Sequence, residues 1–544
     1  MTDKRKTPLA GGAKSGTSTS GRADEQIIAQ SHIQSNGNPN DDINDDIEAL
    51  ASEALDVSEP PPEQASERDE KKRETQAEIL LRLARPVQFF KTPAGDLYAT
   101  FPVNGHTETA PIVEKGGRFR RWLIKRFLEE TARGPSTSAI TDAIRTLEAE
   151  AEFGEVRDVF HRVAEHNGVL YIDMANANWE ALKVTDEGWE IITDPPVRFV
   201  RTRGMLPLPT PESGGNIEEL ADFLNVKPDS REWMQVIGWL IGAYNPRGPY
   251  VHLSLYGEQG TAKSTAARVL RSLTDPNKVE LRQPPKDIED LAVIARHNRI
   301  VAIDNMSYLP GWLSDGLAVM ATGGGMATRQ LYTNDQEAVL EMLQPAILTA
   351  ITEVVTRGDL LDRLAVVTLD PISEKDRREE RIFWESFEKA RPRIFGAILD
   401  ALVLAIRDRY IVKLDRLPRM ADHVVFVEAA APALGWKRGQ YAAVYTEAQS
   451  DAVAAQLEGN TMATVLMDWA DNKAKAMPVT LKTGDLLKAL DKHREALGID
   501  KPKSWPGTAT KLTGDLRRLA PGLRQAGYDL VYLKSRRKWK IEVR

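Results

Sequence analysis

A glycine-bearing segment near the middle of the chain has the residue types and spacing of a phosphate-binding loop. It reads GEQGTAKST over residues 257–265, directly after the apolar stretch HLSLY. The loop pattern is G-x-x-x-x-G-K-[ST], in which backbone N–H groups and a helix N-terminus bind phosphate oxygens. One glycine of the pattern is replaced by alanine here. The predicted cofactor-binding residues are Gly257, Glu258, Gln259, Gly260, Thr261, Ala262, Lys263, Ser264 and Thr265.

A second candidate motif follows at the end of another apolar stretch. The segment RIVAIDN, residues 299–305, is strand-like and ends in Asp304. In ATPases with such a loop, the lysine neutralises phosphate oxygens, while the serine hydroxyl and a strand-end aspartate hold Mg²⁺. The order of the two motifs predicts a site for Mg²⁺·ATP, with Lys263 as the cation and with Ser264 and Asp304 as metal ligands. Taken alone, the loop would also fit an ordinary glycine-rich turn.

The residue after Asp304 is unusual for an enzyme that hydrolyses ATP. Such strands often carry a second acid there, which polarises the attacking water, but this chain has Asn305. An amide orients water but does not accept its proton. Glu258, Asp315, Glu353 or a group from another subunit are the alternatives for that role.

Two further strand-like segments, PAILTAI and RLAVVTL, are separated by the polar insert TEVVTRGDLLDR. A parallel sheet binds its ligand at the carboxyl ends of its strands, which places Thr349 near the γ-phosphate. Arg357 and Arg363 in the insert are candidates for stabilising the transferring phosphoryl group. The alternative for both arginines is a surface salt bridge with Asp359 or Asp362. The predicted catalytic residues are Lys263, Asp304, Asn305, Thr349, Arg357 and Arg363.

Hydrophobic periodicity predicts the elements around these motifs. Helices are expected at 118–130 and 138–152, and a helix followed by a hairpin at 314–343. After Pro371 the chain is charged and helical, with an apolar face formed by Phe383, Phe387 and residues 394–404.

Composition narrows the class of protein. A chain of 544 residues is long enough for three to four domains of about 150 residues. The absence of cysteine excludes disulfides and cysteine-ligated metals. The net charge of −7 does not mark a polyanion binder, although local clusters still can. The N-terminus lacks the apolar core of a secretory signal, and no apolar run is long enough to span a membrane, so a cytoplasmic location is expected.

The last segment of the chain is basic. TLKTGDLLKALDKHREAL and TATKLTGDLRRLAPGLRQAG are predicted to be two helices, and YDLVYLKSRRKWKIEV a hairpin with its turn at residues 535–536. This order suits a winged helix, in which a helix enters a DNA groove and the wing grips phosphates. A protein-contacting or purely solvated face is the alternative. The predicted DNA-binding residues here are Lys511, Arg517, Arg518, Lys534, Arg536, Arg537 and Lys538, and Lys540 adds to the charge.

The segments GEQGTAKST, IVAIDN, ATGGGMATRQLYTNDQEA, PAILTAI and TRGDLLDR together resemble a known module. They are similar to the ATPase module of phage and mobile-element replicative helicases, the primase-helicase type of superfamily 3 within the AAA+ class. The resemblance covers residues 217–372. It implies that Thr349 senses the γ-phosphate and that Arg363 acts as an arginine finger in the neighbouring subunit of a ring hexamer. It also implies a hairpin with Arg329 directed at single-stranded DNA. Such helicases are often fused to a primase or encoded beside one, so a separate primase is a candidate partner.

The expected fold class is α/β, with a P-loop, AAA+-like parallel sheet core. The predicted parts are a disordered tail at 1–66, an N-terminal α+β domain of unknown role at 67–215, the ATPase domain at 216–375, a helical lid and linker at 376–475, and a winged-helix-like DNA-binding domain at 476–544.

The hypothesis that follows is an ATP-dependent DNA helicase or translocase in the replication of a phage or mobile element. Its cofactors would be ATP and Mg²⁺, and its partner single-stranded or double-stranded DNA. One alternative is a DNA-binding switch or assembly factor controlled by ATP, without strand separation. Another is a P-loop kinase for a small molecule, against which the hairpin insert and the basic C-terminal segment argue.

Overall fold

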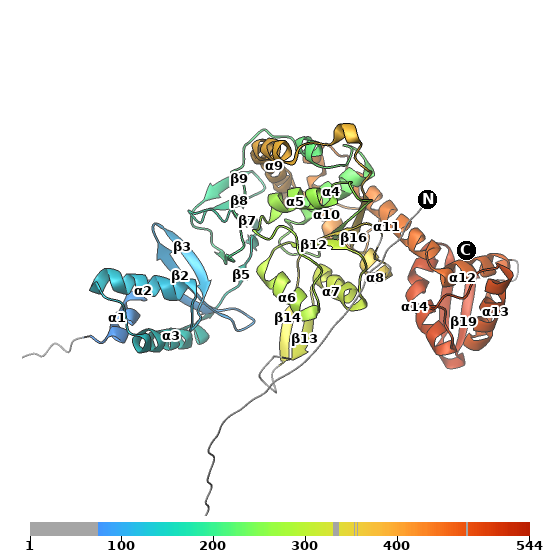
Figure 1. Ribbon diagram of the computed structural model, residues 1–544, viewed down its shortest axis with the longest axis horizontal. Coiled ribbons are helices and arrows are strands. Elements are labelled where there is room, and N and C mark those ends of the chain that lie inside the picture. Colours follow the sequence, from blue (N-terminus) through green and yellow to red (C-terminus); the bar gives the residue numbers. More distant parts are fainter. Residues whose placement is uncertain (1–73, 330–336, 353, 356, 475–476) are drawn as a thin grey trace, which may run out of the picture. The chain divides into compact units, whose positions relative to one another are not determined.

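The computed structural model describes residues 74–329, 337–352, 354–355, 357–474 and 477–544. In this part of the chain several small sheets alternate with helices, which makes it a mixed α/β protein (Figure 1). None of the helices described is long and apolar enough to cross a membrane. The tail predicted at 1–66 lies outside the described residues.

Residues 74–156 combine one sheet with three helices. The first helix begins with a capping box, in which the Thr75 side chain accepts the backbone N–H of Glu78 and the Glu78 carboxylate accepts that of Thr75. The sheet order is β3-β2-β1-β4, and the helices predicted at 118–130 and 138–152 are confirmed. The elements are α1 (Gln76–Leu83), β1 (Gln88–Lys91), β2 (Leu97–Val103), β3 (His106–Pro111), α2 (Arg118–Thr131), α3 (Thr137–Glu152) and β4 (Glu155–Val156).

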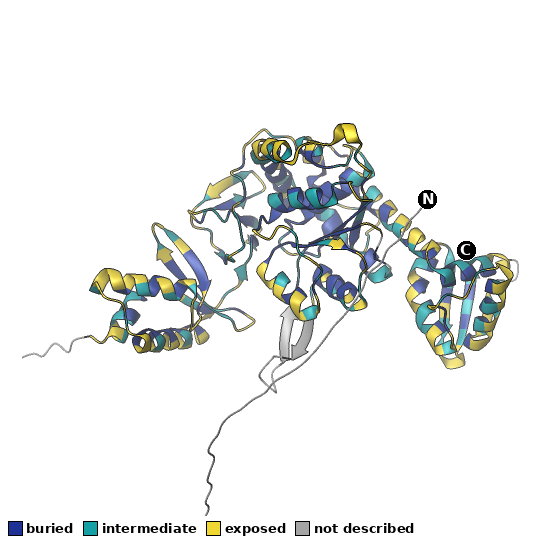
Figure 2. Ribbon diagram, in the orientation of Figure 1, coloured by how far each residue is buried: buried dark blue, intermediate teal, exposed yellow. Residues whose placement is uncertain are grey.

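The next segment is rich in short strands. Its four-stranded antiparallel sheet buries Leu170, Ile172 and Leu182 in the same apolar core as the helices that follow. Figure 2 colours buried residues dark blue. Trp189 Nε1 also donates a hydrogen bond to Asp400 Oδ1 at 2.9 Å. The strands are β5 (Val159–Phe160), β6 (Val163–His166), β7 (Val169–Asp173), β8 (Ala181–Val184), β9 (Trp189–Ile192) and β10 (Arg198–Phe199).

A parallel four-stranded sheet in the order β12-β15-β11-β16 lies at the centre of the next segment. Its strands are buried almost throughout, as expected for a parallel sheet with helices on both faces. The strands are β11 (His252–Tyr256), β12 (Val301–Met306), β15 (Ala346–Ala350) and β16 (Leu364–Thr368). The helices around it are η1 (Ile217–Phe223), α4 (Arg231–Gly242), α5 (Lys263–Thr274), α6 (Ile288–His297), α7 (Gly311–Thr322) and α8 (Gly358–Leu361).

The predicted helix and hairpin between β12 and β15 are confirmed. Helix α7 is followed by β13 (Gly325–Arg329) and β14 (Glu337–Glu341), which pair antiparallel. Residues 330–336, between the two strands, lie outside the described residues.

The helical segment after the sheet is also as predicted, and Phe387 and Ile394 of its first long helix are fully buried. Helix α11 contributes to two apolar cores. Tyr441 and Tyr445 belong to the core around α4 and α9, whereas Val453 and Leu457 belong to the C-terminal core. The elements are η2 (Glu374–Asp376), α9 (Glu380–Asp408), α10 (Ala421–Ala430), η3 (Ala431–Leu434), α11 (Gln440–Glu458) and α12 (Thr461–Asp471).

The C-terminal segment contains the predicted hairpin and two helices, with one difference. Residues 480–482, predicted to be helical, are part of a strand, because Val479 and Leu481 face the C-terminal core and pair with Ile541 and Trp539. The three-stranded sheet β17-β19-β18 is compatible with the predicted winged helix. Its elements are β17 (Val479–Lys482), α13 (Thr483–Ala496), α14 (Ala509–Gln525), β18 (Tyr528–Leu533), η5 (Lys534–Arg536) and β19 (Lys538–Val543).

Candidate nucleotide-binding site

The loop between β11 and α5 has a backbone course that few residue types tolerate. Gly257 has φ of +147°, and a Cβ at this position would lie 2.6 Å from the backbone oxygen of Leu369. Ala262, at the position of the motif's second glycine, has φ of +60°. This left-handed conformation costs a residue with a Cβ about 1–2 kcal/mol. The loop therefore keeps the course of a phosphate-binding loop at some cost in conformational energy.

The Lys263 ammonium lies over the loop itself. Its Nζ donates to the backbone oxygens of Gly257 and Glu258, each at 2.7 Å, and to Thr261 Oγ1 at 3.3 Å. A lysine has three N–H donors, so all of them have acceptors within the loop. Burial lowers the pKa of Lys263, and the nearby carboxylate of Asp304 opposes this shift. A phosphate oxygen that replaced these acceptors would meet a Lys263 ammonium that the loop already holds in position.

The start of α5 adds backbone donors to this cation. No side chain caps the helix N-terminus, so its first N–H groups point at the loop without a side-chain partner among the described residues. Such groups bind phosphate together with the helix dipole. The other predicted loop residues differ in exposure: Glu258, Gln259 and Gly260 are exposed, Ser264 and Thr265 are half-buried, and Thr261 is buried.

Two hydroxyl groups converge on the carboxylate of Asp304. Ser264 Oγ donates to Asp304 Oδ1 at 2.9 Å, and Thr349 Oγ1 donates to the same oxygen at 2.5 Å. Thr349 Oγ1 also accepts the backbone N–H of Asn305 at 2.9 Å. A carboxylate beside a serine hydroxyl supplies the hard oxygen ligands that Mg²⁺ takes in nucleotide sites. The residues present therefore fit a nucleotide-bound Mg²⁺. In the described part of the chain, no group of three or more His, Cys, Asp or Glu side chains forms a separate metal site.

The sheet order explains why these groups meet. β15, which carries Thr349, lies between the loop strand β11 and the Asp304 strand β12. The pairing of β12 with β15 shifts between Ile303 and Met306, and Asn305 within this irregularity has φ of +55°. Asparagine tolerates this conformation better than most residues. The Asn305 side chain is exposed, so it is free to contact a ligand or water.

The two candidate arginines have partners in their own chain. Arg357 forms an ion pair with Asp315 at 2.6 Å, lies 3.7 Å from Asp359 and donates to the Gly311 oxygen at 3.2 Å. Arg357 thus forms the surface salt bridge with Asp359 that was its alternative role. Its distance to Asp315 is shorter. Arg363 donates to the backbone oxygen of Asp359, and burial, followed by the charge of Arg419, lowers its pKa.

One residue at this site has no motif that could have revealed it. Asn225, in the loop after η1, donates through Nδ2 to the Thr261 oxygen at 3.2 Å and to the Asp370 oxygen at 2.6 Å. It therefore ties the phosphate-binding loop to the end of β16. Its position in the stretch LNVKPDS has no spacing that points to the loop.

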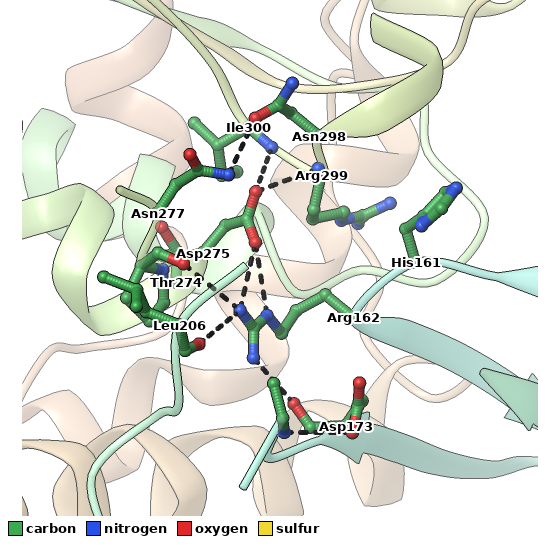
Figure 3. A network of polar contacts seen from close by, with 12 residues as sticks. His161, Arg162, Asp173, Leu206, Thr274, Asp275, Asn277, Asn298, Arg299 and Ile300 are labelled. Carbon is green, nitrogen blue, oxygen red and sulfur yellow. Dashed lines mark hydrogen bonds and ion pairs between the residues drawn. The ribbon is translucent and has the colours of Figure 1, made fainter. Parts of the chain in front are cut away.

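A buried polar network joins the far ends of α5 and β12, as Figure 3 shows. Asp275, directly after α5, accepts the backbone N–H groups of Arg299 at 2.9 Å and Ile300 at 3.2 Å through Oδ2. Its other oxygen accepts two N–H groups of the fully buried Arg162, each at 3.2 Å. Arg162 also donates to the backbone oxygens of Asp173 and Leu206, each at 2.9 Å. The strand-rich segment is thus fixed to the two elements that carry the loop lysine and Asp304.

The predicted DNA-binding residues lie away from this cluster in the sequence. Arg329 ends β13, and its side chain lies outside the described residues. The others are on the C-terminal helix and hairpin, where Lys511, Arg517, Arg518, Lys534, Arg536 and Arg537 are exposed and Lys538 is half-buried.

Two family models match the chain. Residues 217–444 match the model of the actinomycete integrative conjugative element replication protein, and residues 462–544 match the model of the C-terminal domain of RepA from these elements. A search of curated proteins finds no match. The first match includes the loop and Asp304, and the second includes the basic hairpin. Over these segments, the chain is similar to replication proteins of conjugative elements.

Solved structures give weaker likenesses. An apo structure of the NrS-1 C-terminal region is 14% identical, covers 86% of this chain and 99% of its own, and has a TM-score of 0.38. The A form apo structure of that region is 13% identical, with 86% and 98% coverage and a TM-score of 0.36. A full-length MCM homolog from Methanopyrus kandleri is 14% identical, covers 61% of this chain and 87% of its own, and has a TM-score of 0.25. Scores this low do not establish a shared fold.

Proposed function

We propose that this chain is a DNA-dependent ATPase of mobile-element replication, which translocates on DNA or separates its strands. The observation that carries the proposal is the meeting of Lys263, Ser264, Asp304 and Thr349 at the carboxyl end of one parallel sheet. The matches to replication-protein models support the role in replication.

The loop residues would bind the triphosphate. Lys263 would exchange its three acceptors in the loop for phosphate oxygens, and the first N–H groups of α5 would contact the same anion. Ser264 and Asp304 would hold Mg²⁺, which when bound neutralises charge on the phosphoryl oxygens. Ser264 already donates to Asp304, so the two groups that would hold the metal lie side by side.

Thr349 has a different part in this proposal from the one the resemblance implies. Its O–H donates to Asp304 and its oxygen accepts the Asn305 N–H, so its single donor is in use. We assign it the positioning of Asp304. Direct sensing of the γ-phosphate would require that bond to break.

The proton of the attacking water needs an acceptor other than Asn305. Of the three acids considered, Asp315 is paired with Arg357, and Glu353 lies outside the described residues. Glu258 is exposed in the loop, and its carboxylate has no hydrogen bond or ion pair within the part of the chain that the structure describes. Of the acids that the structure describes, Glu258 is therefore the favoured acceptor.

A ring assembly stays a proposal that rests on the resemblance. In it, Arg363 would reach the nucleotide of a neighbouring subunit, and the hairpin with Arg329 would contact single-stranded DNA. The contacts of Arg357 with Asp315 and Gly311 suit a residue that braces α7 within its own subunit. A separate primase would be a partner of such an assembly.

The experiment that tests the proposal measures ATP hydrolysis by the purified chain with and without single-stranded DNA. The Lys263→Ala variant should lose about 10²–10³-fold in turnover, because the charge on the phosphate is no longer neutralised. Lys278→Ala, at an exposed lysine shortly after α5, is the matched control and should behave as the original chain. Absence of turnover in the original chain under all conditions would overturn the proposal.

A second function is favoured by one observation, the exposed amide of Asn305 where an acid would speed hydrolysis. In this alternative, ATP controls assembly on DNA and no strands are separated. A forked duplex distinguishes the two: strand release that requires ATP supports the helicase, whereas DNA-stimulated hydrolysis without release supports the switch.

A further inference from the structure

Two sets of cations in the C-terminal segment differ in their partners. Those on α14 are engaged within the protein. Arg518 forms an ion pair with Asp515, and Lys511 Nζ donates to the Trp505 oxygen at 3.4 Å. The Arg517 guanidinium carbon lies 4.9 Å from the centre of the Tyr532 ring. These contacts leave fewer free positive groups on α14 to bind an external anion.

One face of α14 is also turned towards α8 and α11. Lys511, Asp515, Arg518 and Gly522 follow one another at helical spacing, and all four line a cleft of about 790 Å³ shared with α8 and α11. At its far end, a Cβ on Gly522 would lie 3.1 Å from Val453 Cγ1 of α11. A recognition helix must enter a groove of about 12 Å width with such a face free. Here that face looks into a cleft of this chain and its end at Gly522 is packed on α11, although Lys511 and Arg518 themselves are exposed.

The second set lies around the turn of the hairpin, and we call it the wing edge. Its residues have no side-chain hydrogen bond or ion pair within the described part of the chain; they are Lys482, Lys534, Arg536, Arg537 and Lys538. Lys482 belongs to it because β17 pairs with β19 so that Lys482 lies directly opposite Lys538. Sequence analysis did not identify Lys482, since this pairing joins distant segments.

The fold holds the wing edge in place. The Thr483 N–H donates to the Arg537 oxygen at 3.3 Å, which ties the turn to the start of α13. Like charges directly opposite each other in a sheet are destabilising. Folding alone therefore does not account for a lysine pair at Lys482 and Lys538 with three more cations beside it. A polyanion that contacts all of them does.

We propose that the wing edge is the surface with which this chain binds double-stranded DNA, through its phosphates, while α14 stays packed on α11. The inference rests on the proposed function and specifies its mode of DNA contact. A DNA duplex carries one negative charge per ~1.7 Å of axis, so several neighbouring free cations can each meet a phosphate. Phosphate contacts carry no base information, so binding should be independent of sequence and steeply dependent on salt.

The test uses the full-length chain and a short duplex of random sequence, with binding followed by fluorescence anisotropy over a range of salt concentrations. The wing-edge variant is Lys482→Gln with Lys538→Gln. The plot of log K against log salt has a negative slope, and loss of two phosphate contacts should make it shallower by about 2. The α14 variant, Arg517→Gln with Arg518→Gln, removes the same charge and should leave the slope unchanged.

A third variant, Lys488→Gln with Lys492→Gln on α13, controls for the loss of two positive charges elsewhere in the segment, and circular dichroism checks that each variant is folded. A slope reduced by the α14 variant or by the α13 variant, but not by the wing-edge variant, would overturn the inference and leave the proposed function intact. Binding of single-stranded DNA only would do the same. If the original chain binds neither form of DNA, the proposed function itself fails.

Discussion

At the scale of single residues, the orientation of Asp304 depends on the hydroxyl group of Thr349. Thr349 is buried, and its oxygen bridges the Asp304 carboxylate and the Asn305 backbone. A β-branched side chain has few rotamers in a strand, so the hydroxyl is held in one place. The orientation of Asp304 therefore depends on Thr349 as well as on Ser264.

Replacing Thr349 by valine, which has the same shape, would remove both bonds and leave the Asn305 N–H without its partner. We expect turnover to fall by about tenfold or more, and the Mg²⁺ concentration for half-maximal activity to rise, because Asp304 would lose its orientation. Thr349→Ser keeps the hydroxyl and should stay close to the original chain. A fall in turnover with no change in Mg²⁺ dependence would show that Thr349 acts on the phosphate instead.

At the scale of elements, the strand before the loop is fixed by a buried histidine. His252 in β11 donates through Nε2 to the Leu317 oxygen at 2.8 Å and accepts the Ala346 N–H through Nδ1 at 3.1 Å. It thereby links β11 to α7 and to the start of β15. Both ring nitrogens have partners only when the ring is neutral. Burial lowers the pKa of His252 to about 4, and the bond to the Leu317 oxygen opposes this shift.

This histidine predicts a loss of stability in acid. The unfolded chain protonates it near pH 6.5 and the folded chain only near pH 4, so the unfolded state binds more protons between these values. Its contribution is complete above about pH 6.5 and is lost as the pH falls towards 4, on the order of 3 kcal/mol.

The measurement compares the free energy of unfolding in urea at several pH values between the original chain and His252→Asn. The variant does not titrate at this position, so its stability should change less across the window. Equal pH dependence of the two proteins would contradict the assignment.

At the scale of the whole molecule, the buried pair of Arg162 and Asp275 joins parts that are far apart in the sequence. Their side chains are 0% and 2% exposed, and the pair sits where the strand-rich segment meets α5 and β12. Removing one partner from a buried ion pair leaves an uncompensated charge, at a cost of about 3–5 kcal/mol.

Arg162→Met should therefore destabilise the protein by about this amount, measured by urea unfolding with tryptophan fluorescence. Arg296→Met is the matched control, because Arg296 pairs with Asp96 at the surface, where ion pairs contribute about 1 kcal/mol or less. If the two variants lost the same stability, the network in Figure 3 would not be what fixes the strand-rich segment.

The sequence was sufficient for features that are local. The loop, its flanking strand and helix, and the hairpin after α7 each lie in one continuous segment with clear periodicity. Features that depend on pairing between distant segments were missed. The residues of β17 resemble the first turn of α13 in sequence and become a strand only by pairing with β19. Asn225 contacts the loop and the residues after β16 directly, but both lie far from it in the sequence. The partner of Thr349 follows from the strand order, which no local pattern contains.

The sharing of α11 between two cores has a mechanical consequence. Tyr445 and Gln449 of α11 donate to the backbone oxygens of Asp362 and Leu364, beside Arg363, whereas Val453 and Leu457 lie in the C-terminal core. A helix of 19 residues is a stiff rod about 28 Å long. A small tilt imposed at the arginine end would swing the other end through a larger arc. A movement of the backbone beside Arg363 would therefore be passed along α11 to the C-terminal core.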